Sequence, residues 1–123
     1  MNQRNILITA SLFGACAVGL GAFGAHAFKA MLLANGRLDT YELAARYQFY
    51  HTLALLGVGM LIDKFPSLKT GALLLILGMV IFCGSLYILA LANQPTWGAV
   101  TPVGGVLLIL GCLSLVGAFY KSR

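Results

Sequence analysis

The sequence predicts an all-α membrane protein built as a four-transmembrane-helix bundle. Of its 123 residues, 60% are hydrophobic and only 9% are charged, and the mean hydropathy is +0.93. Soluble domains carry roughly 25% charged residues, so this composition indicates a chain that resides in lipid. Its length leaves room for four apolar helices with short connections. Residues 1–123 are therefore predicted to form a single four-span membrane domain.

Four apolar runs define the predicted spans, at about residues 6–28, 44–62, 70–92 and 99–120. Such runs have the length of helices that cross a hydrocarbon core ~30 Å thick. Turn-forming and charged residues separate the runs. The first connection contains Asn35-Gly36, and the other two cover residues 63–69 and 93–98.

The second span is the shortest apolar run and carries the most informative polar residues. The sixteen residues 47–62, which follow directly on Arg46, contain no charged side chain. They cover only ~24 Å of helix. Residues 39–42, Asp-Thr-Tyr-Glu, have the spacing of a capping box, so we expect the helix to begin near Thr40. Arg46 and His51 are then drawn into the membrane, where ionisable groups are costly and mark functional sites.

Lys and Arg residues predict the orientation. Five fall on one side of the membrane (Arg4, Lys64, Lys69, Lys121 and Arg123) and three on the other (Lys29, Arg37 and Arg46). Because cytoplasmic loops carry an excess of Lys and Arg, both termini are predicted to be cytoplasmic in a multi-pass protein of the cell (inner) membrane. The net charge of +5 does not indicate nucleic-acid binding, since the cations are scattered at span ends without a basic stripe.

Small residues at heptad-like spacing predict how the spans pack. They are Ala10, Gly14, Ala17, Gly21 and Gly24 in the first span, Gly71, Gly78, Ser85 and Ala92 in the third, and Gly104, Gly111 and Ala118 in the fourth. In lipid, helices associate by close approach through such residues, and seven-residue repeats favour crossings near ~+20°. The same glycine-rich faces are candidates for pairing copies of the chain into a homo-oligomer.

Counting depth at ~1.5 Å per residue places the polar side chains of all spans in one layer, in the outer half of the membrane. Its members are the predicted ligand-binding residues: His26, Arg46, Gln48, His51, Ser85, Tyr87 and Thr101. Because Pro102 suits a first helical turn, Thr101 is predicted to cap the fourth helix, whose free N–H groups then face the same layer.

Arg46 and His51 each leave alternatives open. Arg46 has three candidate partners: protein groups such as Glu42 or the carbonyls that end the first span, the phosphate of an anionic lipid, and an anionic solute. His51 is expected to share a helix face with Tyr47 and to form a hydrogen bond. A metal held by His26 and His51 is disfavoured, because their estimated depths differ by ~12 Å.

The sequence shows no set of residues that would carry out a reaction. It contains no nucleophile with a matching base and acid, no metal motif and no dinucleotide-binding loop, so no catalytic residue, metal or cofactor is predicted. Cys16, Cys83 and Cys112 lie within apolar runs and lack CxxC spacing. They are predicted to be unpaired thiols that pack as small apolar side chains.

Four blocks of sequence carry a resemblance to a known family. They are residues 21–27 (GAFGAHA), 45–51 (ARYQFYH), 84–87 (GSLY) and 101–105 (TPVGG). In this order and spacing they resemble the small bacterial membrane proteins grouped as domain-of-unknown-function family 423, to which a small mitochondrial transmembrane protein of animals is similar. The resemblance covers almost the whole chain. It implies a multi-pass protein of the cell membrane and no particular reaction, substrate or cofactor.

Two functions follow from these observations. In the first, the polar layer forms an outward-facing pocket that binds or transports a small anionic solute or a lipid headgroup. In the alternative, the protein is a structural or partner subunit of a membrane complex with no ligand of its own. The polar layer then serves only to fix the register of the helices.

Overall fold

The computed structural model describes residues 1–121, which form helices and short connections without a β-strand. The helices are α1 (Gln3–Ala25), α2 (Lys29–Ala34), α3 (Leu38–Leu61), α4 (Leu68–Ala92), the 3₁₀ helix η1 (Pro95–Ala99) and α5 (Thr101–Lys121). The predicted all-α class is thus confirmed.

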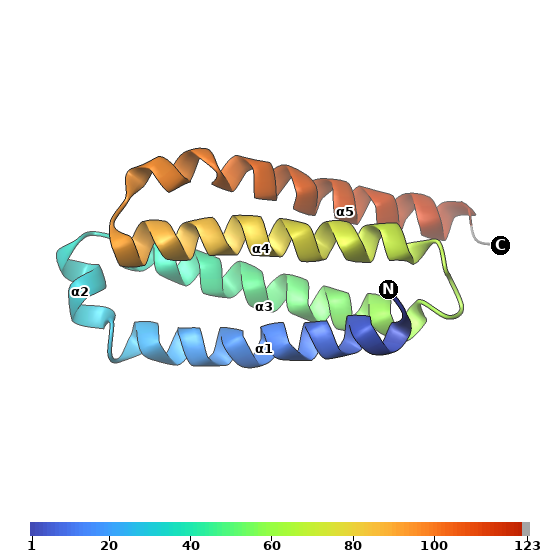
Figure 1. Ribbon diagram of the computed structural model, residues 1–123, viewed down its shortest axis with the longest axis horizontal. Helices are drawn as coiled ribbons and strands as arrows, with labels where there is room; N and C mark the ends of the chain where they lie inside the picture. Colours follow the sequence, from blue (N-terminus) through green and yellow to red (C-terminus); the bar gives the residue numbers. More distant parts are fainter. Residues whose placement is uncertain (122–123) are drawn as a thin grey trace.

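The four long helices run antiparallel in chain order and lie side by side (Figure 1). The start of α1 and the end of α5 lie at one end of the molecule, together with the connection from α3 to α4; α2 and η1 lie at the other. The extensive interfaces join α1 to α3, α3 to α4, and α4 to α5. The helices therefore form a folded row rather than a closed ring, which leaves room for a groove on either side.

Three helical segments are long and apolar enough to cross a membrane: Gln3–Ala25, Leu68–Ala92, and η1 with α5 as Pro95–Lys121. α3 has a similar length, 24 residues. It is less apolar because Arg46 and Gln48 lie in its first half and His51 lies just past its middle. The structure supports a multi-pass membrane protein, and the crossing by α3 remains a prediction.

The interface of α4 with α5 is the closest in the molecule. A Cβ atom added to Gly104 would lie 2.3 Å from the backbone nitrogen of Phe82, and one added to Gly78 would lie 2.9 Å from that of Leu108. Only glycine permits this approach of two backbones. The small-residue repeats of the third and fourth spans thus meet each other, as the spacing predicts for packing seams.

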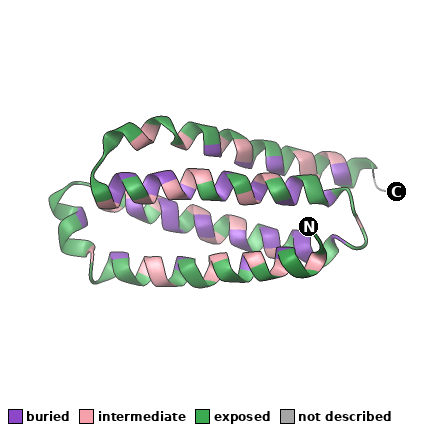
Figure 2. Cartoon of the chain, viewed as in Figure 1, coloured by how far each residue is buried: buried purple, intermediate pink, exposed green. Residues whose placement is uncertain are grey.

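α4 is the most buried helix of the row. Eleven of its residues are buried, against four in α1 and four in α5. Buried residues are concentrated along α3 and α4, and exposed residues lie along the outer sides of α1 and α5 (Figure 2). In a bilayer the exposed apolar side chains of the outer helices would face lipid.

Two predicted helix caps are wrong. α3 begins at Leu38, with Arg37 at its N-cap and no side-chain cap bond, so residues 39–42 form no capping box. The reason is the turn at Gly36, whose φ of 66° directs the chain straight into the helix. Thr101 is already inside a helical stretch, because η1 runs directly into α5. Its hydroxyl lies beside the Trp97 carbonyl instead of capping free N–H groups.

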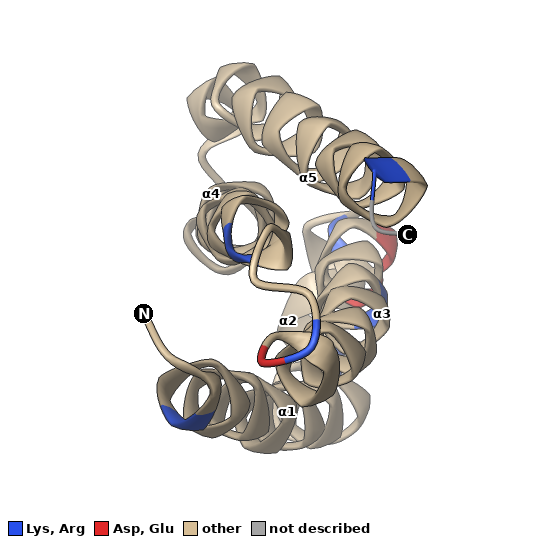
Figure 3. Cartoon of the chain, turned by 90° about the vertical axis from the view of Figure 1, so that its right-hand side faces the viewer, with Lys and Arg blue, Asp and Glu red and all other residues tan. Residues whose placement is uncertain are grey.

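Most charged residues gather at the two ends of the molecule, while Arg46 lies two turns inside α3. Arg4, Lys64, Lys69 and Lys121 are exposed at the end that holds the start of α1, which faces the viewer in Figure 3. Lys29 and Arg37 lie at the opposite end, with α2 and the start of α3. Arg123 lies outside the described residues. The two groups are thus separated by the length of the helices, as the predicted orientation requires.

Candidate functional site

The structure distributes the seven predicted site residues over four places. Gln48 and Tyr87 meet, Ser85 and Thr101 meet, His51 lies in a separate groove, and His26 and Arg46 are exposed. The cause lies in helix geometry, since residues two apart on a helix face nearly opposite directions. With Gln48 directed inward, Arg46 is directed outward.

Gln48 links three helices. Its Nε2 donates to the Phe13 carbonyl of α1 at 2.8 Å, and its Oε1 accepts from the Tyr87 hydroxyl of α4 at 2.8 Å. The side chain is only 5% exposed. Since both ends of the amide are bonded, this polar group is fully paired where water is absent. Gln48 thereby holds α1, α3 and α4 in register.

Ser85 and Thr101 join α4 to α5, with their hydroxyl oxygens 2.6 Å apart. Each hydroxyl has one proton to donate, and each also lies near a carbonyl. The shorter carbonyl contact belongs to Ser85, which lies 2.9 Å from the Phe82 oxygen, against 3.3 Å between Thr101 and the Trp97 oxygen. We therefore assign Ser85 as the donor to Phe82 and Thr101 as the donor to Ser85, which leaves both hydroxyls paired.

Arg46 uses none of the protein partners expected from the sequence. Its side chain is exposed on the outward face of α3, which it shares with Glu42. Within residues 1–121 it forms no ion pair with Glu42 and no bond to the carbonyls that end α1. His26, which follows the last residue of α1, is also exposed and forms no side-chain bond in the described part of the chain.

Tyr41 is a residue that the sequence reasoning missed. It is 1% exposed, and its hydroxyl donates to the Leu20 carbonyl of α1. Its ring occupies the space left by Gly24, where an added Cβ would lie 2.3 Å from the ring. A signal was present, because Tyr41 lies seven residues before Gln48 and so on the same face of α3. Tyr41 and Gln48 together fix α1 against α3.

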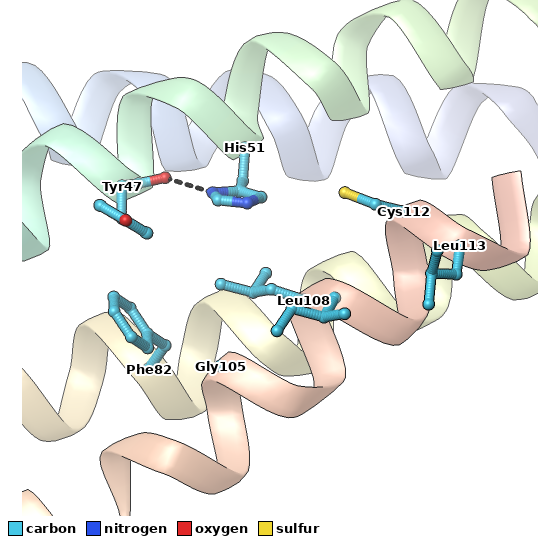
Figure 4. A pocket seen from close by; sticks show the side chains of 8 residues that line it. Tyr47, His51, Phe82, Gly105, Leu108, Cys112 and Leu113 are labelled. Carbon is cyan, nitrogen blue, oxygen red and sulfur yellow. Dashed lines mark hydrogen bonds between the residues drawn. The ribbon is translucent and has the colours of Figure 1, made fainter. Parts of the chain in front are cut away.

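His51 lies in an apolar groove of about 430 Å³ between α3 and α5, with α4 as its floor. We call it the α3–α5 groove. The stacked rings of Tyr47 and Phe82, with centroids 4.9 Å apart, form part of its wall. The imidazole lies inside the groove and the Cys112 sulfur is directed towards it (Figure 4). The lining residues are Tyr47, His51, Phe82, Gly105, Leu108, Ile109, Cys112 and Leu113.

The hydrogen bonding of His51 fixes which ring nitrogen carries the proton. Nδ1 lies 2.8 Å from the Tyr47 carbonyl oxygen one turn earlier, which confirms the shared face. A carbonyl oxygen only accepts, so Nδ1 must donate. In the neutral ring Nε2 then carries a lone pair. This nitrogen has no bonding partner among residues 1–121, and it is a hydrogen-bond acceptor within a mostly apolar groove.

A second groove of about 240 Å³ lies on the other side of the row, between α1 and α4. We call it the α1–α4 groove. Its lining includes the Gln48–Tyr87 pair and three sulfur-containing side chains, Cys16, Met79 and Cys83. Its carbon-rich lining resembles that of the α3–α5 groove, so both differ from the polar pocket described by the sequence-based hypothesis. No group of three His, Cys, Asp or Glu residues within 1–121 is placed to hold a metal ion.

Long apolar helices, polar side chains that pair between them and charges that lie mostly at the ends define a multi-pass membrane protein. Residues 20–105 match the model of the family described as "Protein of unknown function (DUF423)", and the chain belongs to this family. The predicted resemblance is thus confirmed.

Relatives with similar sequences cover nearly the whole chain. A UPF0382 membrane protein of Staphylococcus saprophyticus is 45% identical over 121 residues, which is 97% of this chain and 99% of the relative. The UPF0382 inner membrane protein YgdD of Escherichia coli K12 is 40% identical over 126 residues, which is 100% of this chain and 95% of the relative. No solved structure matches. The second relative is named an inner membrane protein, which agrees with the predicted inner-membrane location.

Proposed function

We propose that the protein binds an amphiphilic molecule of the bilayer in the α3–α5 groove. One observation carries the proposal, which is the unpaired Nε2 acceptor of His51 in a mostly apolar lining. Pockets for small molecules are commonly apolar, with a few placed polar groups that orient the ligand. A hydroxyl on an apolar body satisfies both requirements, because it donates to Nε2 while the body covers the apolar wall.

The position of the groove favours a ligand that arrives from lipid. Ile109, Cys112 and Leu113 form its α5 wall and are exposed at the side of the molecule. Access from the side suits a molecule already dissolved in the bilayer. Tyr47 and Phe82 offer ring faces to an unsaturated or cyclic ligand.

A small anionic solute fits this groove poorly. No Lys or Arg lines it, and a charge left unpaired in apolar surroundings is strongly disfavoured. Of the two ligand classes predicted from the sequence, the lipid therefore fits better. Arg46 serves the same proposal from outside the groove, since its exposed guanidinium can reach lipid phosphate by snorkelling along α3.

The experiment compares lipids and other small amphiphiles that co-purify with the protein, measured by mass spectrometry after mild detergent extraction. His51→Phe keeps the ring volume and removes the acceptor, and Gly105→Leu fills the groove beside Phe82. A Cβ at Gly105 would lie 3.6 Å from the Phe82 ring, so the backbone tolerates a side chain there. Gly57→Leu is the matched control, because nothing lies within 4 Å of a Cβ at that exposed position.

We expect a specific amphiphile to accompany the wild type and the Gly57→Leu protein, and to be lost from His51→Phe and Gly105→Leu. Retention by both groove variants, or a lipid profile equal to that of bulk membrane in every sample, would refute the proposal.

The second candidate function is that of a structural or partner subunit. The pairing of Gln48 with Phe13 and Tyr87 supports it, because these bonds hold three helices without involving a ligand. This candidate predicts that no groove variant changes the bound molecules, and that a membrane protein complex co-purifies with the wild type in stoichiometric amount.

A further inference from the structure

Three sulfur atoms that the proposed function does not use line the α1–α4 groove. Cys16 comes from α1, and Met79 and Cys83 come from α4, where their spacing of four residues places them on one face. Cys16 is exposed towards the groove and Cys83 is buried at 4% exposure. Both thiols are free in the structure. Three soft donor atoms thus border one cavity.

Contacts through α3 indicate that the two thiols lie at similar depth. α1 and α4 run in the same direction, with α3 antiparallel to both (Figure 1). Near one end of the groove Thr52 contacts both helices, since a Cβ at Gly14 would lie 3.4 Å from its methyl group and its hydroxyl lies 3.9 Å from the Met79 sulfur.

Near the other end of the groove Tyr41 gives a second point of register. It bonds to the Leu20 carbonyl of α1 and stacks edge-on against Tyr87 of α4 at 5.2 Å. Cys16 lies between Gly14 and Leu20, just as Cys83 lies between Met79 and Tyr87. The two thiols therefore face the cavity between the same pair of contacts.

The polar atoms that line this groove are already engaged with one another. The Gln48 amide and the Tyr87 hydroxyl are joined in one chain of bonds that ends on the Phe13 carbonyl. The two cysteine sulfurs are the donors that remain available, and the Met79 sulfur is engaged only in a weak 3.9 Å contact from the Thr52 hydroxyl. Thiolate and thioether sulfur are soft ligands of the kind that select Cu(I), Zn²⁺ and Fe–S clusters. Structural Zn²⁺ takes four ligands from Cys, His, Asp or Glu, so three sulfur atoms that include a thioether favour Cu(I).

We propose that the α1–α4 groove binds one Cu(I) ion through the sulfur atoms of Cys16, Met79 and Cys83. On binding, both cysteine thiols lose their protons to solvent and bind as thiolates, while the thioether stays neutral. Two thiolates and one Cu(I) give the site a single negative charge.

The test is a Cu(I) titration of the purified full-length protein in detergent, under reducing anaerobic conditions and in competition with a chromogenic Cu(I) chelator. Loss of an outer-shell partner alone costs ~10–100-fold in metal affinity, so removal of a ligand by Cys16→Ser or Cys83→Ser is expected to cost at least ~10-fold. Met79→Leu is expected to weaken binding less. X-ray absorption of the copper-loaded wild type is expected to show sulfur ligands only.

Cys112→Ser is the matched control, because Cys112 is an exposed thiol in the other groove. It is expected to leave the affinity and the 1:1 stoichiometry unchanged. Cys83 is buried, so its variant is used only if its thermal unfolding matches the wild type; Cys16 is exposed, and its variant keeps the test decisive. Wild-type affinity in Cys16→Ser, or binding lost in Cys112→Ser, overturns the proposal. Neither result bears on the amphiphile in the α3–α5 groove.

Discussion

The Tyr87 hydroxyl of α4 donates to Oε1 of Gln48 in α3 across 2.8 Å. This bond matters because Gln48 occupies the half of α3 that is least apolar. In a bilayer an amide without partners costs several kcal/mol, on the order of an unsatisfied backbone group. Here both ends of the amide are bonded within the protein. The pairing makes a crossing by α3 compatible with lipid despite its composition.

The first prediction concerns this bond. Tyr87→Phe keeps the ring and leaves Oε1 of Gln48 without its donor, so we expect the protein to lose about 0.5–2 kcal/mol of stability. Gln48→Leu also removes the bond to Phe13 and should cost at least as much. Unfolding of the purified protein in detergent measures both. If the double variant loses as much as the two single losses added together, the two side chains are not coupled and the prediction fails.

The second prediction concerns the seam between α4 and α5. Gly104→Ala places a methyl group 2.3 Å from the Phe82 backbone nitrogen, which cannot turn away as a side chain would. We expect a loss of about 1–3 kcal/mol, as for other overpacked interiors. Gly117→Ala on the same helix is the control, since nothing lies within 4 Å of its added Cβ. Alanine has the higher helix propensity, so Gly117→Ala should be neutral or slightly stabilising. A gain of equal size in both variants would show that helix propensity, and not the seam, governs the effect.

The long helices and the α4–α5 seam were predictable because their signals are local. Apolar runs identify the helices directly. A seven-residue repeat of small side chains identifies the packing face of a helix from its own sequence, before the neighbouring helix is known. Gly78 and Gly104, both members of predicted repeats, lie in close contact with the neighbouring helix as expected. Cap positions were less predictable, because turn geometry at Gly36 overrode the capping pattern that follows it.

The membership of the candidate site was less predictable for a geometric reason. Depth counting ranks residues along the membrane normal and carries no information on which way each side chain points. Arg46, Gln48 and His51 have neighbouring depths, yet they lie on the outward face, the inward face and the α3–α5 groove. Successive residues of a helix are rotated by ~100°. Combining this angle with the estimated depth would have shown that the three side chains point towards different surfaces.

The third prediction concerns the crossing by α3. In a background with the three native cysteines replaced by serine, Asn35→Cys and Ser67→Cys place exposed thiols before and after α3. We expect a membrane-impermeant maleimide to label position 35 from outside the cell and position 67 only from the cytoplasm. Thr96→Cys, beside the start of α5, should behave like position 35. Labelling of positions 35 and 67 from the same side would rule out the crossing.

The fourth prediction concerns Asn93, the only non-glycine residue within 1–121 with a positive φ, at 51°. It ends α4 in the left-handed conformation, and its Oδ1 accepts from Nε of Arg37 at 3.0 Å. The residue thus terminates one helix and ties that end to the residue before α3. The two roles separate by substitution, because glycine adopts the left-handed conformation freely and alanine does not.

We expect Asn93→Gly to lose only the exposed bond to Arg37, and Asn93→Ala to lose a further ~1 kcal/mol for the strained backbone. Thermal unfolding in detergent compares the two. Arg37→Met is the control, because it removes the same bond and leaves residue 93 unchanged, so it should cost about as much as Asn93→Gly. If Asn93→Ala unfolds at the same temperature as Asn93→Gly, the left-handed turn at the end of α4 contributes no strain.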